Sequence, residues 1–235
     1  MKSFTRSVVP FVLVLSGVAA GSACANPEPP MVPAAAVSPQ QELINDSTDA
    51  IKTMRANPSF KGIDHYLARA QGVMIFPELK KGGLIVGGQG GGGVLLARKD
   101  ANWSSPAFYS LGAGSAGLQI GYEKSTVVLV LMSKPALDGA LKGGFTLGAD
   151  ATVAAGTVGD AAATAATSPA ADVIEFVEAS GVFAGASFSG AVISPDTKFN
   201  AAYYSPEATP RAIVLEGRFY RGAAEPLRKA LIVPR

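Results

Sequence analysis

The sequence has little of the side chains on which most metal and nucleophilic sites are built. Its 235 residues include one cysteine, one histidine and one tryptophan, and charged residues make up only 16% of the chain. One histidine and one cysteine cannot form a zinc site, and a single cysteine cannot form an internal disulfide. Hydrophobic residues reach 48%, which is ample for a core. We therefore expect no metal ion, and a fold that is stabilised by its core alone.

The first 24 residues differ in character from the rest of the chain. Lys2 and Arg6 precede an apolar run from Val8 to Ala20, and small residues then lead to Cys24. This order is typical of a secretory signal peptide, and the run is short for a membrane span. Without this segment the chain has 18 basic and 18 acidic residues, so it lacks the positive field of a general nucleic-acid-binding protein. We expect an exported protein that binds no nucleic acid.

The single cysteine lies at the end of this signal peptide. Its position favours a bacterial lipoprotein in which Cys24 is acylated and becomes the mature N-terminus, although Gly21 stands where such signals usually carry leucine. The alternative is ordinary cleavage before Asn26, because Ala23-Cys24-Ala25 also fits an A-x-A site. Ala25 after an acylated cysteine predicts a protein of the bacterial cell envelope, anchored to the outer membrane and facing the periplasm.

The remaining sequence divides into a tether and one domain. Residues 25–39 are rich in proline and predict a semi-rigid tether, and residues 40–235 predict the domain. Ser38 and Pro39 have the character of a helix N-cap and first turn. The expected helices are Gln41–Arg55, Phe60–Ala70, Pro135–Leu141 and Ala223–Leu231, with short strands from Gly72 onwards and a strand at Arg211–Gly217.

These short strands with glycine turns define the expected architecture. We predict an α+β fold with a mainly antiparallel sandwich or barrel-like body, N-terminal helices and short peripheral helices.

The glycine-rich stretch GLIVGGQGGGGVLLARKD (83–100) contains the G-x-G-x-x-G spacing of dinucleotide-binding folds at Gly88, Gly90 and Gly93. Those folds need a helix directly after the glycines, because the helix N-terminus holds the phosphates. Here the strand-like Val94–Arg98 follows, and no acidic residue lies about 20 positions further on. We predict a hairpin with its tip at Gly90–Gly93, and no nucleotide or other cofactor.

The sequence also lacks a convincing catalytic pattern. The segment Ala113–Gly117 misses the first glycine of the G-x-S-x-G nucleophile elbow, and the only histidine, His65, precedes the serine. We therefore predict that the chain is not an enzyme and that His65 has an ordinary surface or packing role. No spacing among the carboxylates singles out an acid–base pair, and solvated surface positions are expected for them: Asp138, Asp172, Glu175 and Glu178.

Five ordered blocks of the sequence together match a known family: Gly72–Arg98, Trp103–Glu123 followed by VVLVLM, Thr146–Gly159, Ser180–Asp196 and Asn200–Tyr204. They resemble the SYLF domain, a lipid-binding domain also found in yeast actin-patch proteins. The resemblance runs from about Leu43 to Gly217, with Ser205 where the family usually has glycine.

The resemblance implies a binding protein rather than an enzyme. It implies recognition of phosphoinositides or other anionic membrane phospholipids through a basic surface and an amphipathic N-terminal helix, here Gln41–Arg55. Some yeast relatives also bind actin, but actin is not expected as a partner of an exported protein. A structural or interaction lipoprotein that binds an envelope protein or peptidoglycan is the alternative function.

Six basic residues are predicted to form the lipid-binding site. Lys80 and Lys81 precede the first strand of the predicted hairpin, and Arg98 and Lys99 end its second strand. A hairpin brings such ends together, so these four cations are expected to share one edge. The helix adds the last two: Lys52 and Arg55.

Overall fold

The computed structural model describes residues 37–83, 86–116, 123–156, 171–179, 182–183 and 188–234. Val37–Arg235 form one compact unit. The predictions for the signal peptide, the tether and Cys24 lie outside the described residues. Within the described ranges, no helix has both the length and the apolar character needed to cross a membrane.

The domain begins with the predicted N-terminal helix, α1 (Pro39–Ala56). The Ser38 hydroxyl accepts a hydrogen bond from the backbone N–H of Gln41 (3.2 Å), and Pro39 occupies the first turn, as the sequence indicates. The second predicted helix is shorter than expected and consists of η1 (Pro58–Phe60) and α2 (Ile63–Leu67). The buried residues of α1 form one face toward the sheet: Ile44, Ser47, Thr48, Ile51 and Met54.

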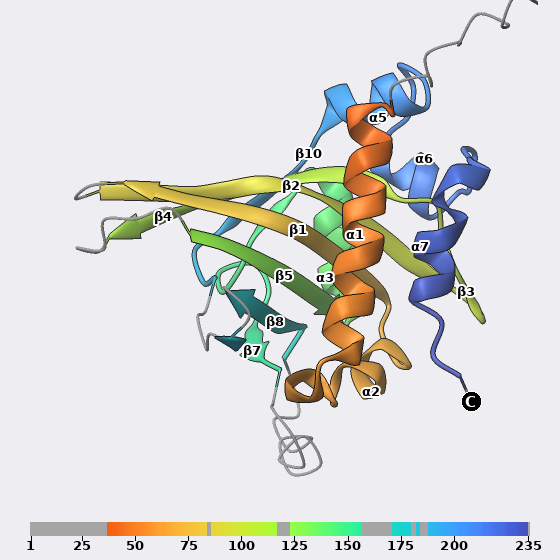
Figure 1. Cartoon of the computed structure of the whole chain (residues 1–235). Coiled ribbons are helices and arrows are strands. Elements are labelled where there is room, and N and C mark those ends of the chain that lie inside the picture. The colour runs from red at the N-terminus through yellow and green to blue at the C-terminus, as the bar shows by residue number, and fades with distance from the viewer. Residues whose placement is uncertain are drawn as a thin grey trace, which may run out of the picture. The chain divides into compact units, whose positions relative to one another are not determined.

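The described strands form a curled sheet in the order β6-β10-β4-β2-β1-β5-β8-β7, with β3 paired to β2 and β9 paired to β8 (Figure 1). Every pairing between the described strands is antiparallel except that of β7 with β8. The predicted α+β fold with a mainly antiparallel, barrel-like body is therefore confirmed. The strands are β1 (Gly72–Gly83), β2 (Val86–Lys99), β3 (Asn102–Trp103), β4 (Ala107–Ala116), β5 (Glu123–Leu131), β6 (Phe145–Thr146), β7 (Val153–Ala155), β8 (Val173–Ala179), β9 (Val182–Phe183) and β10 (Val192–Pro195).

Alternate residues of the central strands contribute to two separate cores. Val73 and Ile75 of β1 pack in the core that includes α1 and α7 (Glu225–Ala230), and Met74 and Phe76 pack in the core that includes α3 (Lys134–Lys142). Figure 1 shows α1 lying across β1 and β2 with α7 beside it, and α3 on the other side of the sheet. Burial on both faces explains why the central strands are almost continuously apolar.

The predicted hairpin tip at Gly90–Gly93 is wrong, because these glycines lie inside β2. Pairing of β1 with β2 continues past them to Gly83 opposite Gly87. The register shifts by one residue where β1 bulges at Pro77–Glu78, which brings its backbone close to β2. A Cβ atom on Gly93 would overlap the ring of Phe76. The glycine run therefore makes room for a bulge.

The predicted strand at Arg211–Gly217 is also wrong, because this stretch contains α6 (Pro210–Val214). The Thr209 hydroxyl accepts a hydrogen bond from the backbone N–H of Ala212 (3.2 Å), and Pro210 stands in the first turn. These are the signals that start a helix. A second helix, α5 (Thr197–Tyr203), was not predicted from the sequence, and Asp196 caps it in the same way.

One of the four carboxylates expected in solvent is buried. Glu175 lies on β8, is 3% exposed, and accepts a hydrogen bond from the backbone N–H of Phe188 (3.1 Å). Burial raises the pKa of this carboxyl group to about 7, and the hydrogen bond offsets part of that effect. Strand alternation places Glu175 on the same side as the core residues Val173 and Val177. The other three carboxylates are partly exposed: Asp138, Asp172 and Glu178.

Candidate functional site

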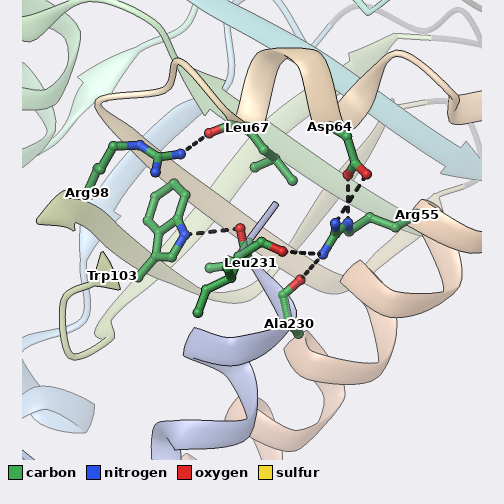
Figure 2. A network of polar contacts seen from close by, with 8 residues as sticks. Arg55, Asp64, Leu67, Arg98, Trp103, Ala230 and Leu231 are labelled. Carbon is green, nitrogen blue, oxygen red and sulfur yellow. Dashed lines mark hydrogen bonds and ion pairs between the residues drawn. The ribbon is translucent and has the colours of Figure 1, made fainter. Parts of the chain in front are cut away.

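The only tryptophan of the chain is the centre of the candidate site. Trp103 is 1% exposed, and the guanidinium of its cross-strand partner Arg98 lies 4.6 Å from the ring centroid. The indole Nε1–H donates to the carbonyl of Leu231 (3.1 Å), and the Trp103 carbonyl accepts from Nε of Arg228 (2.8 Å). Trp103 thereby joins β2 and β3 to α7 and the residue after it, as Figure 2 shows for Arg98, Trp103 and Leu231.

Two of the predicted lipid-binding residues are used inside the fold (Figure 2). Arg98 donates to the carbonyl of Leu67, at the end of α2, and desolvation lowers the pKa of its guanidinium. Arg55 donates to the carbonyl of Ala230 (2.5 Å) at the end of α7 and pairs with Asp64 (2.6 Å). Both side chains satisfy carbonyls at helix C-termini, which have no partner within their own helix. They do not form the expected outward-facing basic patch.

The expected basic edge is not formed either. Lys80 pairs with Gly90, whereas Gly72 at the start of β1 pairs with Ala97, next to Arg98. Lys80 lies eight positions after Gly72, a separation of about 26 Å in extended strand, so the two basic pairs lie at opposite ends of the β1–β2 hairpin. The prediction treated Lys80 as preceding the strand, but β1 continues through Pro77 and past it.

The remaining predicted cations are scattered. Lys80 has a 61% exposed side chain that pairs with Glu78 (3.1 Å), and Lys52 is exposed on α1, 4.0 Å from Asp49. The backbone of Lys81 lies in β1, but its side chain is outside the described part of the structure. Lys99 is exposed at the end of β2. Of the six predicted residues, Lys99 is the one that lies in the site described next.

Cationic and aromatic residues surround Trp103 and its hydrogen-bond partners. Tyr220 is 63% exposed, and the guanidinium of Arg228 lies 5.3 Å from its ring centroid. The segment GRFYR (217–221) also carries two exposed arginines beside Tyr220. The alternation of arginine with aromatic residues in this segment is visible in the sequence, but the sequence-based prediction did not use it. We call this group the C-terminal basic-aromatic surface, and it consists of Lys99, Arg218, Tyr220, Arg221 and Arg228.

A cavity of about 130 Å³ lies within this surface. This volume is well below the roughly 300–1,000 Å³ of pockets that enclose drug-sized molecules. The cavity therefore has room for a small group but not for a whole lipid. Its lining combines two cations with aromatic rings and small polar residues: Lys99, Trp103, Ser104, Ser105, Ile213, Gly217, Phe219, Tyr220 and Arg228.

A second pocket, of about 320 Å³, has the opposite charge and lies between α1 and the bulge of β1. Its lining includes Asp46, Asp49, Glu78 and Glu178. The pKa of Asp46 is raised, first by burial and then by repulsion from neighbouring carboxylates. Because the apolar face of α1 is buried and its outer face is acidic here, α1 lacks the features of a membrane-binding helix.

The described residues contain no group of three histidine, cysteine, aspartate or glutamate side chains placed to hold a metal ion. His65 is exposed on α2, with its ring centroid 5.5 Å from that of Tyr66. The fold and the site together define an α+β domain that presents a cationic and aromatic surface.

Comparison with known proteins identifies the family. Residues 112–232 match the family described as Ysc84, Las17-binding protein actin regulator. Protein YSC84 of Saccharomyces cerevisiae is 34% identical over 173 residues, which cover 71% of this chain and 36% of that protein. The human SH3 domain-containing YSC84-like protein 1 is 33% identical over 143 residues, which cover 60% of this chain and 42% of that protein. The chain belongs to the Ysc84 family, which confirms the resemblance to SYLF domains.

The relatives' names describe binding proteins. LAS seventeen-binding protein 3 of Saccharomyces cerevisiae is 33% identical over 171 residues, which cover 70% of this chain and 37% of that protein. The chain thus spans less than half the length of these curated relatives. The family description names an actin regulator, so it gives no support to the expectation that actin is not a partner.

Proposed function

We propose that this protein is a non-enzymatic lipid-binding protein of a bacterial cell envelope, which recognises anionic phospholipids, of which phosphoinositides are one kind. The observation that carries the proposal is the exposed Tyr220 between Arg218 and Arg221. Tyrosine favours the interface between membrane and water, where its ring is partly apolar and its hydroxyl is hydrated. Arg221 and Arg218, which also makes an exposed ion pair with Glu216 (3.7 Å), would contact the lipid phosphates, and each cation near an anionic membrane adds about 1 kcal/mol.

The distribution of acids supports this orientation. The acidic pocket lies between α1, the β1 bulge, β5 and β8, and it does not share a lining residue with the basic cavity. An anionic membrane attracts the C-terminal basic-aromatic surface and repels the acidic pocket. Without residues 1–24 the chain has equal numbers of acids and bases, so its net charge gives no attraction, but this distribution of charge lets it bind in one orientation.

Flotation with anionic vesicles tests the proposal. Protein purified without residues 1–24 carries no acyl chain, so vesicle binding depends on the domain. Reversal of both arginines, Arg218→Glu with Arg221→Glu, should weaken binding to phosphatidylglycerol vesicles at least about tenfold, and the remaining binding should fall as salt is raised. The matched control is Lys52→Glu with Lys80→Glu, which changes the net charge equally and should have little effect.

The same pair of variants separates this site from the site predicted by sequence. Loss of flotation in the Lys52/Lys80 variant with normal flotation in the Arg218/Arg221 variant would contradict the proposal. Circular dichroism of both variants checks that the fold is retained.

We propose that Cys24 is the second membrane attachment, as an acylated N-terminus. A single acyl chain gives only marginal binding, so an anchored protein needs more than one chain or an additional basic surface. Intact-mass analysis of membrane-extracted protein should show a mature chain that starts at Cys24 and carries acyl groups. A mature chain that starts at unmodified Asn26 would refute the anchor and leave the basic surface alone to bind the membrane.

Binding of an envelope partner, either a protein or peptidoglycan, is the second candidate function. It is considered because the family description and a relative's name refer to binding of Las17. Flotation that is unaffected by either pair of charge reversals, together with saturable binding to isolated peptidoglycan, would favour this candidate.

A further inference from the structure

The cavity within the C-terminal basic-aromatic surface has features that a general attraction to membranes does not require. Its volume is about 130 Å³, and Trp103 and Phe219 are among its lining residues. Trp103 and Ser104 are almost fully buried, so this wall is packed into the domain. The Ser104 hydroxyl accepts from the backbone N–H of Ala97 (3.0 Å) and donates to the carbonyl of Ser105 (2.9 Å). Its hydrogen-bonding capacity is therefore largely used within the protein.

Two donors at this cavity remain for a ligand. Arg228 uses Nε for the Trp103 carbonyl and Nη1 for Glu225 (2.9 Å), and among the described residues its Nη2 has no acceptor. No described carboxylate lies within ion-pair distance of Lys99. Gly217 adopts φ +67°, and a Cβ there would lie 2.7 Å from Nζ of Lys99. Glycine thus leaves space for the lysine head beside the cavity.

The charges at the cavity define the kind of anion that fits. The charge of Arg228 is already balanced by Glu225, so the uncompensated charge is that of Lys99. One uncompensated positive charge and two donor groups match a monoanion whose oxygens can accept from both. A phosphodiester is also a monoanion, but it carries two ester chains where a carboxylate carries one, so a carboxylate suits a cavity of about 130 Å³ better. A phosphate dianion would bring a second charge and further oxygens into a partly aromatic cavity, where unpaired polar groups are unfavourable.

We infer that this cavity binds a single carboxylate group, with Lys99 as its counter-ion and Nη2 of Arg228 as the second donor. The carbon next to the carboxylate would pack against the less buried aromatic residues of the lining, Phe219 and Tyr220. The carboxylate can belong to a small free acid or to the C-terminus of a peptide. This inference goes beyond membrane binding and does not depend on it, because it uses neither Arg218 nor Arg221.

The chain supplies its own reporter for this site, because Trp103 is its only tryptophan and lines the cavity. Tryptophan emission is followed while protein without residues 1–24 is titrated with propionate at constant ionic strength. We expect a saturable change with a Kd on the order of 1–10 mM, which is reasonable for so small a ligand. Propylammonium, which has the same length and the opposite charge, should give no saturable change.

Two further arms identify the source and the chemistry of the ligand. Acetylated alanylalanine with a free carboxylate is compared with its C-terminal amide. Binding of the acid form alone assigns the site to peptide C-termini, and binding of propionate without the peptide assigns it to small acids. Inorganic phosphate or dimethyl phosphate that binds more tightly than propionate would overturn the assignment to a carboxylate.

Substitution of the counter-ion completes the test. Lys99→Gln should weaken propionate binding at least about tenfold, because it removes the one uncompensated charge. Lys99→Arg should retain most of the affinity, and Lys142→Gln, an exposed lysine at the end of α3, should leave it unchanged. Equal binding by Lys99→Gln and the unaltered protein, with unchanged thermal unfolding, would refute the inference, as would no response to propionate at all.

Discussion

Replacement of Glu175 by glutamine should raise the free energy of unfolding by about 3 kcal/mol at about pH 8 and by less than about 1 kcal/mol at about pH 5. Glu175 is buried, and its pKa in the folded protein is raised from 4.5 to about 7. Between these two values the folded protein holds a proton that the unfolded chain has released. Stability therefore falls as the pH rises from about 4.5 to about 7, and it stays lower above that range.

Glutamine removes this loss because it has no charge to bury. Its side-chain oxygen can still accept the hydrogen bond from the backbone N–H of Phe188. Urea unfolding at several pH values measures the difference between the two proteins. The matched control is Glu178→Gln, at a partly exposed residue of the same strand, which should change stability by less than about 1 kcal/mol. A stabilisation by Glu175→Gln that is equal at both pH values would contradict the assignment of the buried charge.

Replacement of Gly93 by alanine should lower the free energy of unfolding by about 3 kcal/mol, at the upper end of the usual cost of overpacking. The added Cβ would overlap both the Phe76 ring and the carbonyl oxygen of Ile75, and the latter belongs to backbone that cannot rotate away. Gly112→Ala on β4 is the matched control, because a Cβ there meets no atom within 4 Å. It should change stability by less than about 0.5 kcal/mol. Thermal or urea unfolding of both variants measures the effect.

Equal stability of the two alanine variants would show that the bulge of β1 can move away from β2. The glycine run would then have to be explained by some other feature of the strand.

Features of the fold that depend on neighbouring residues in the chain could be predicted from the sequence. The start of α1 follows from Ser38 and Pro39, and the position of α3 from its short helical pattern, because caps and periodicity act within one or two turns. The apolar alternation and glycine turns indicated a mainly antiparallel body. The strand at β8 was missed, and with it the burial of Glu175, because two glutamates in seven residues obscure the alternation.

The candidate site depended on contacts between residues far apart in the chain. Arg55 was predicted to face the membrane, but it binds the carbonyl of Ala230, and no local pattern announces a carbonyl that is 175 residues away. Lys80 and Arg98 were predicted to be neighbours, but the bulge at Pro77–Glu78 extends β1 and places them at opposite ends of the hairpin.

The sequence by itself determined the family, the fold class and the scarcity of catalytic and metal-binding side chains, because these follow from composition, local pattern and ordered motifs. Only the tertiary structure decided which cations remain free to bind a ligand. Arg55 and Arg98 are occupied by the carbonyls of helix ends, whereas Lys99 remains exposed beside Trp103 and Tyr220. Charge is a property of a residue, but its availability depends on which acceptors the fold brings within hydrogen-bonding distance.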